Sequence, residues 1–192
     1  MEDKAKGQLV ADILDLRYNY GGHVLIAKVL DEGADANEAD SGGMTPLMAV
    51  ARNCGTSEIR LLLERGADPR LADMFGDTAL HFAATSQMVD DGVELLIAAG
   101  ANIHAANNLG MTPLHEAAAN AKWTGVAVTN CLLRHGADPS ARDEKGKRPF
   151  NLAKDKPTKG LLKAAYEQRQ MTNDPGIKPG TLGEKPWRSP RP

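Results

Sequence analysis

Two short motifs recur four times along the 192-residue chain, and their regular spacing constrains the fold more than any other feature of the sequence. The first motif, Gly-Ala-Asp or Gly-Ala-Asn, begins at Gly33, Gly66, Gly100 and Gly136. The second motif, Gly-Met-Thr-Pro-Leu or a variant of it, begins at Gly43, Gly76, Gly110 and Gly146. Both motifs recur at spacings of 33, 34 and 36 residues, which is typical of one supersecondary unit stacked on copies of itself.

One copy, residues 40–72, predicts a turn followed by two helices. Gly43 suits a tight turn, Thr45 is placed to cap a helix through its hydroxyl, and Pro46 fits the first helical position. After a second turn, an outer helix rich in leucine is expected to end at Gly66 in the left-handed conformation. Each copy has apolar residues on two faces, so it can bury both only by stacking on its neighbours.

The pattern resembles the ankyrin repeat over roughly residues 8–170. The resemblance implies an all-α solenoid of stacked helix–turn–helix units joined by β-hairpin-like loops. The first unit lacks the Thr-Pro-Leu phrase and the last has Arg148 in place of the capping threonine, so both are expected to cap the stack. The expected parts are a lead over 1–7, an N-capping repeat over 8–39, repeats over 40–72 and 73–106, a repeat with an inter-helix insertion over 107–142, a C-capping repeat over 143–170 and a Pro/Gly-rich tail over 171–192.

The residues with reactive side chains do not form a recognisable active site. His81 and His115 fall at the histidine of the repeat motif, and the resemblance implies that they hydrogen-bond backbone between neighbouring turns. Cys131 replaces a buried leucine of the earlier repeats, and Cys54 lies in a turn two units away, so no disulfide is expected. Neither a CxxC zinc motif nor a phosphate-binding glycine loop occurs in the sequence. We therefore expect no enzymatic activity, no cofactor and no metal.

Charge is distributed unevenly along the chain. Residues 1–142 hold 11 Lys and Arg against 19 Asp and Glu, whereas residues 143–192 hold 12 against 6. A basic end can mark an interaction segment, but it can also simply neutralise an acidic body. Because basic residues are not interleaved with aromatic ones, nucleic-acid binding is not expected. No apolar run is long enough for a membrane span, and the first residues do not resemble a signal peptide, so we expect a cytoplasmic protein, or an exported one whose signal has been removed.

The resemblance implies that the hairpin tips and the exposed face of the inner helices bind a partner protein. The residues at these positions are Met44, Met74, Phe75, Asp77, Asn108, Leu109, Met111, Lys145 and Lys147 in the tips, and Arg52, Asn53, Thr85 and Asn120 in the inner helices. Five of the tip residues are large and apolar, which is unusual for positions surrounded by water.

The predicted function is that of a non-enzymatic protein–protein interaction module, monomeric by itself. The alternative is a dedicated inhibitor or immunity-type protein that covers the active site of a partner enzyme. Two questions stay open from the sequence. The apolar tips could simply pack on the next hairpin, and Trp187 in the tail could either dock on the solenoid or contact a partner.

Overall fold

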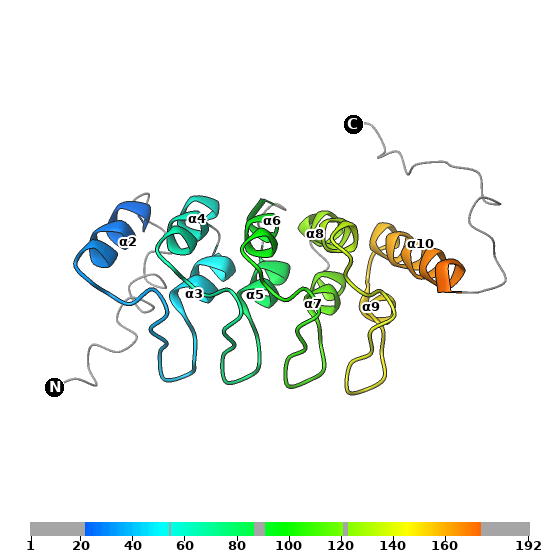
Figure 1. Cartoon of the computed structure of the whole chain (residues 1–192). Helices are drawn as coiled ribbons and strands as arrows, with labels where there is room; N and C mark the ends of the chain where they lie inside the picture. Colours follow the sequence, from blue (N-terminus) through cyan, green and yellow to red (C-terminus); the bar gives the residue numbers. More distant parts are fainter. Residues whose placement is uncertain (1–21, 54, 87–90, 121–122, 174–192) are drawn as a thin grey trace.

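A computed structural model describes residues 22–53, 55–86, 91–120 and 123–173. In this part of the chain the helices form two layers, and four hairpin loops project from the inner layer in a row (Figure 1). The inner layer consists of α3 (Pro46–Asn53), α5 (Ala79–Thr85), α7 (Pro113–Ala119) and α9 (Pro149–Leu152). The outer layer consists of α2 (Gly22–Asp31), α4 (Thr56–Glu64), α6 (Asp91–Ala98), α8 (Trp123–Arg134) and α10 (Lys156–Asn173).

The expected all-α solenoid is confirmed. Within the described ranges the only β-type pairing is an isolated antiparallel bridge between Ala72 and Thr78, at the base of the second hairpin. The inner helix expected in the N-capping repeat, Cys54 in its turn and Trp187 in the tail all lie outside the described residues. The helix of the C-capping repeat runs to Asn173, three residues beyond the predicted end of that repeat.

The inner helices begin where the repeated motif predicts. The Thr45 hydroxyl accepts a hydrogen bond from the Met48 N–H at 3.3 Å, and Pro46 is the first residue of α3. Such a cap satisfies one of the N–H groups that the first helical turn leaves without an intrahelical partner. In the last unit the Arg148 N–H donates to Asn151 Oδ1 at 2.9 Å, so the N-terminus of α9 keeps a side-chain contact of this kind although threonine is absent.

The two motif histidines link neighbouring units. His81 Nδ1 accepts the Thr78 N–H at 3.1 Å, and its Nε2 lies 3.0 Å from the Met111 carbonyl oxygen in the next hairpin. An N–H group can only donate, so Nδ1 holds the lone pair and Nε2 carries the proton. His115 repeats the arrangement with the carbonyl of Lys147. Burial lowers the pKa of both imidazoles, which agrees with this neutral form. The structural role predicted for these histidines is confirmed.

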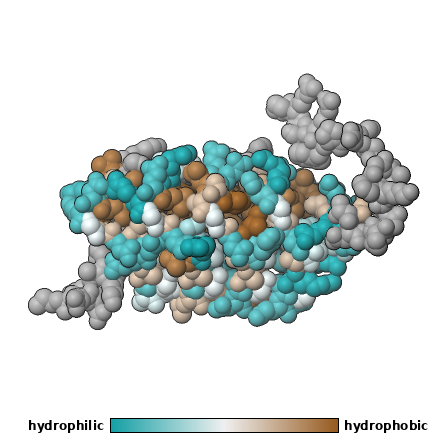
Figure 2. Space-filling view, viewed as in Figure 1, coloured by the Kyte–Doolittle hydropathy of each residue, from teal (hydrophilic) through white to brown (hydrophobic). Residues whose placement is uncertain are grey.

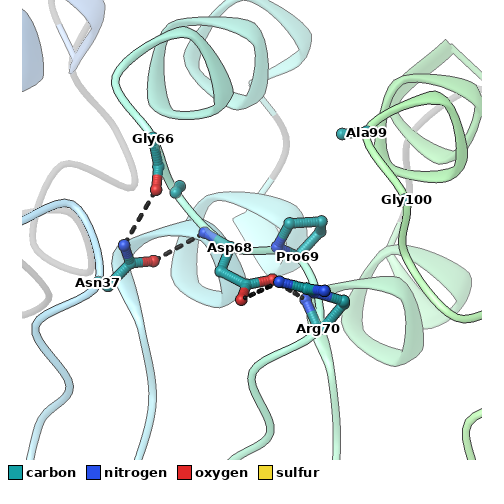
Figure 3. Close-up of a pocket in the computed structure, with 8 residues that line it drawn as sticks. Asn37, Gly66, Asp68, Pro69, Arg70, Ala99 and Gly100 are labelled. Carbon is teal, nitrogen blue, oxygen red and sulfur yellow. Dashed lines mark hydrogen bonds and ion pairs between the residues drawn. The ribbon is translucent and has the colours of Figure 1, made fainter.

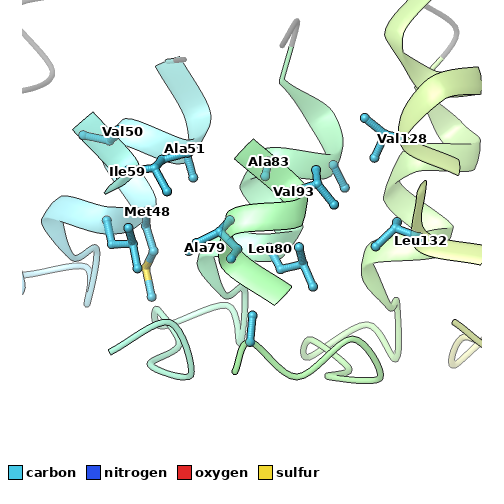
Figure 4. Close-up of a cluster of buried hydrophobic side chains, with 14 of the residues drawn as sticks. Met48, Val50, Ala51, Ile59, Ala79, Leu80, Ala83, Val93, Val128 and Leu132 are labelled. Atoms are coloured by element: carbon cyan, nitrogen blue, oxygen red, sulfur yellow. The ribbon is translucent and has the colours of Figure 1, made fainter. Parts of the chain in front are cut away.

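The core is a continuous strip between the two layers, to which each unit contributes similar residues (Figure 4). One leucine from each of three inner helices and one from each of three outer helices is almost completely buried: Leu47, Leu80 and Leu114, and Leu62, Leu96 and Leu132. Small residues such as Ala84 and Ala118 are fully buried and let the inner helices lie close together. Burying one leucine stabilises the fold by roughly 1.5–3 kcal/mol, so stacking supplies most of the stability.

The outer helices end as the first motif predicts. After α4, the Ala67 N–H donates to the Leu62 carbonyl at 2.9 Å and Gly66 has a φ of +86°. The corresponding glycines after α2, α6 and α8 also have positive φ, which confirms the predicted left-handed caps. The insertion predicted in the third complete repeat coincides with a longer outer helix, since α8 has 12 residues and α6 has 8.

Candidate functional site

Each hairpin begins with an Asp or Asn whose side chain holds the turn closed. In the second hairpin Asp73 Oδ1 accepts the Phe75 N–H at 2.8 Å and the Asp77 N–H at 2.9 Å. The same pair of contacts is made in the other hairpins by Asp40, Asn107 and Asp143. These residues are not among those predicted from the sequence to form the site. The signal was present, because an Asp or Asn stands three residues before every glycine of the second motif.

Backbone hydrogen bonds join the hairpins to one another. The Met74 N–H donates to the Gly42 carbonyl at 2.9 Å, and the Asn108 N–H donates to the Phe75 carbonyl at 2.9 Å. The Glu144 N–H continues the series with the Leu109 carbonyl at 3.0 Å. We call residues 40–44, 73–77, 107–111 and 143–147 together the hairpin row (Figure 1). Because each tip is bonded to the next, the row presents its side chains from one pre-organised backbone.

Three large apolar side chains of the hairpin row face water. Met74 is 64% exposed, Phe75 is 62% exposed and Leu109 is 58% exposed. In the space-filling view, the lower edge of the molecule is light brown near the second hairpin and teal near the fourth (Figure 2). Exposed apolar residues that lie next to one another on a soluble protein often mark a binding site for another protein. The alternative that these three side chains pack on the next hairpin does not fit their exposure.

The other predicted tip residues have mixed environments. Met44 is half-buried and packs against the hydrophobic core, and Met111 is also half-buried. Half-buried Asp77 accepts a hydrogen bond from Asn107 Nδ2 at 2.8 Å. The remaining tip residues Asn108, Lys145 and Lys147 are exposed. The structure therefore brings all of the predicted tip residues into one row but leaves only part of them free to touch a partner.

The predicted site residues of the inner helices differ in their exposure to solvent. Arg52 and Thr85 are exposed, and the side chain of Asn53 lies outside the described part of the structure. Asn120 is half-buried, and its Nδ2 lies 3.4–3.5 Å from the carbonyl oxygens of Ala84, Thr85 and Ser86 at the end of α5. These long contacts connect the end of α7 to the preceding unit. Asn120 therefore has a structural role in addition to any contact that it makes with a partner.

Charged side chains lie beside the second hairpin and in the fourth hairpin. Glu116, on α7, is half-buried, and its pKa is raised by burial and by the nearby Asp77 carboxylate. The fourth hairpin exposes Glu144 as well as Lys145 and Lys147. A partner that follows the row would thus meet apolar side chains at the second and third hairpins, with the Asp77 carboxylate beside them, and charged groups of both signs at the fourth.

A shallow depression of about 460 Å³ lies on another part of the molecule, between the second and third units (Figure 3). Asn37 bridges across units at its edge, because its Nδ2 donates to the Gly66 carbonyl at 3.0 Å and its Oδ1 accepts the Asp68 N–H at 2.7 Å. The side-chain hydrogen bond from Arg70 lowers the pKa of Asp68. These polar groups satisfy one another, so the depression does not offer a set of groups aimed at a ligand.

No helix in the described ranges is both long enough and apolar enough to cross a bilayer.

Comparison with known proteins supports the architecture. A family model described as ankyrin repeats in three copies matches residues 18–107, and a single ankyrin repeat model matches residues 109–144. The mitochondrial disaggregase of Bos taurus is 31% identical over 154 residues, which cover 78% of this chain and 22% of that protein. Ankyrin repeat and SOCS box protein 6 of Homo sapiens is 34% identical over 121 residues, which cover 60% of this chain and 24% of that protein.

A bacterial relative has a more similar length. The ankyrin repeat protein YahD of Escherichia coli is 29% identical over 139 residues, which cover 71% of this chain and 69% of that protein. By contrast, the chain spans less than a quarter of the disaggregase and of the SOCS box protein. Ankyrin repeats generally serve as protein–protein interaction modules and are typically non-enzymatic. With two family models matching more than half of its residues, the chain belongs to the ankyrin-repeat family.

Proposed function

We propose that the chain binds a partner protein through the hairpin row, with Met74, Phe75 and Leu109 as the central apolar contacts. The observation that carries the proposal is the exposure of these three side chains, 58–64%, on a hydrogen-bonded backbone. Aromatic residues and methionine are enriched in the centres of protein interfaces, and a few such anchors usually supply most of the affinity. A rigid row also lowers the entropy lost on binding.

Charge supports the same surface. Asp77 stands two residues after Phe75, with Glu116 close to its carboxylate, and Glu144, Lys145 and Lys147 lie in the fourth hairpin. A matching partner would present apolar side chains with a basic group beside them for Asp77, and groups of both charges opposite the fourth hairpin. Complementary charges of this kind fix the orientation of a partner and speed its association.

The test begins with capture of a partner from the native organism and continues with calorimetry on variants. Phe75→Ala should weaken binding by about 2 kcal/mol or more, because it removes a large anchor at the centre of the row. The midpoint of thermal unfolding should hardly change, since the side chain is mostly in water. Deletion of residues 171–192 should leave the affinity nearly unchanged.

Two methionines offer a matched control. Met74 is 64% exposed on the hairpin row, whereas Met171 is 43% exposed on α10 at the end of the stack. Met74→Ala should weaken binding and Met171→Ala should not. Equal affinities of the Phe75→Ala variant and the wild-type chain, together with loss of binding on deletion of the tail, would overturn the proposal.

A narrower form of the proposal is that the partner is an enzyme and that the row covers its active site. It is supported by the same pre-organised row, because rigid surfaces are typical of inhibitors that bind without large rearrangement. An activity assay of the captured partner with increasing amounts of the chain tests it. If turnover by the partner is unchanged when it is saturated with the chain, the chain binds the partner without inhibiting it, and the narrower proposal is wrong.

A further inference from the structure

The outer layer contains a cluster of three polar or ionisable side chains outside the hairpin row, of which Cys131 is also part of the core. Cys131 and His135 are four residues apart on α8 and the turn that follows it, and Glu94 lies on the adjacent helix α6 (Figure 1). Cys131 Sγ and His135 Nε2 each lie 4.0 Å from Glu94 Oε1, and the three atoms are all within 4.8 Å of one another. We propose that these three residues form a zinc-binding site that joins the outer helices of two neighbouring repeats.

The chemistry of the donors favours zinc. Thiolate, imidazole and carboxylate are the three ligand types that Zn²⁺ takes in proteins, with bond lengths of about 2.0–2.3 Å. Tetrahedral coordination at these lengths separates the ligand atoms by roughly 3.3–3.6 Å. The two separations of 4.0 Å from Glu94 Oε1 therefore need to close by about half an ångström, and the separation of Cys131 Sγ and His135 Nε2, which is at most 4.8 Å, by up to about 1.2 Å. The sequence predicted no metal site, with Cys131 as a buried apolar residue, although the four-residue spacing of Cys131 and His135 places them on one face of a helix.

Burial gives the three ligands different freedom to move. Cys131 is completely buried and held by the packing of α8. The Glu94 and His135 side chains are 44% and 36% exposed, so they can rotate by the small amount required. Because Glu94 and His135 are partly exposed, we expect water to complete the coordination as a fourth ligand. On binding, the Cys131 thiol loses its proton to solvent, and the thiolate and the Glu94 carboxylate together balance the two charges of the ion.

Arg134 competes with the metal for Glu94. Its Nη2 lies 3.1 Å from Glu94 Oε1, and both side chains are about half exposed. An ion pair of this kind contributes little in water, and its loss is a small cost compared with three metal bonds. Removing the guanidinium should therefore tighten zinc binding, which is an effect that a purely structural cluster would not show.

The experiment uses the full chain, freed of metal with a chelator and then titrated with Co²⁺ as a spectroscopic probe and with Zn²⁺ by calorimetry. The wild-type chain should bind one equivalent of each, and Co²⁺ should give a thiolate-to-metal charge-transfer band. Zn²⁺ at tenfold excess over its dissociation constant should raise Tm by a few degrees, reversibly with chelator.

The variants assign the ligands. His135→Ala alters a partly exposed side chain and should weaken zinc binding by more than about tenfold without loss of folding. Cys131→Ser should abolish the charge-transfer band. The chain has two cysteines, and Cys54→Ser should retain the band because Cys54 is not part of the proposed site. Arg134→Met should strengthen zinc binding several-fold. A wild-type chain that binds no Zn²⁺ at about 100 µM, or a band that survives in Cys131→Ser and disappears in Cys54→Ser, would overturn the proposal.

Discussion

Two sets of left-handed glycines run along the molecule, one at the ends of the outer helices and one in the hairpin row, and their surroundings differ. A Cβ atom added at Gly100, after α6, would have no atom within 4 Å. A Cβ atom added at Gly110, in the third hairpin, would lie 2.8 Å from the Glu144 nitrogen of the next hairpin. Both residues have positive φ, +94° and +70°. The helix ends thus need glycine for its backbone conformation alone, whereas the hairpin row needs it also for close contact between units.

The difference shows how the repeat motif serves two purposes. The glycines after the outer helices end each helix locally, and a unit could end its helix this way without a neighbour. The hairpin glycines let the backbone of one tip approach the backbone of the next, which the hydrogen bonds between tips require. Gly146 supports this interpretation, because no hairpin follows it within the described residues and a Cβ atom there would again meet nothing within 4 Å.

The largest effect is expected for Gly110→Ala. Left-handed strain costs about 1–2 kcal/mol, and displacement of the adjoining backbone adds roughly 1–3 kcal/mol, so the free energy of unfolding should fall by about 2–5 kcal/mol. Gly146→Ala is the matched control, because it has the same strain without the contact. Urea denaturation of both variants measures the difference. Equal destabilisation would break the distinction between the two kinds of glycine position.

A smaller effect is expected at the helix end. Gly100→Val should destabilise the chain by roughly 1–2 kcal/mol through left-handed strain, and Gly100→Asn by clearly less, because asparagine tolerates this conformation. Asparagine should not rescue position 110, where the added Cβ atom itself is the obstacle. Thermal unfolding of Gly100→Val, Gly100→Asn, Gly110→Ala and Gly110→Asn measures these differences. A Gly110→Asn variant as stable as Gly100→Asn would contradict it.

The smallest effect concerns acid. The pKa values of His81 and His115 are lowered by burial, so below about pH 6.5 the unfolded chain binds protons that the folded chain does not. Stability should therefore be constant above pH 6.5 and fall as the pH decreases towards the lower pKa values of the folded state. Glu116, whose pKa is raised, acts in the opposite direction and offsets part of the loss at the acid end of this range.

Since both imidazoles bond the hairpins to the inner helices, the acid effect should reach the hairpin row before the outer helices. Hydrogen exchange at pH 7 and pH 5 measures this, after correction for the intrinsic rates. The N–H groups of Asn108 and Glu144 should lose more protection than those of Ala67 and Ala101. His81→Gln removes one titrating group, and its stability should depend less on pH. Equal loss of protection in the hairpin row and at the ends of the outer helices would contradict the prediction that protonation of the histidines acts first on the hairpin row.

The sequence by itself determined the architecture, because the signals of the repeat are local. Thr45, Pro46 and Gly66 specify helix starts and ends from within a few residues, and the period of the motifs implies that the units stack. The positions of the hairpin tips followed from the same motifs. The sequence also showed directly that the tip residues Phe75 and Leu109 are apolar.

Only the tertiary structure decided which of these residues face solvent and which residues from different units meet. Met44 and Met111 stand one residue after the motif glycine and are half-buried, whereas Phe75 and Leu109 stand one residue before it and are mostly exposed. The sequence grouped all four as apolar tip residues, and only the packing of Met44 against the core separates the two positions. The approach of Glu94 to Cys131 and His135 likewise depends on the packing of α6 against α8, so contacts between residues more than one repeat apart become visible only when the units are stacked.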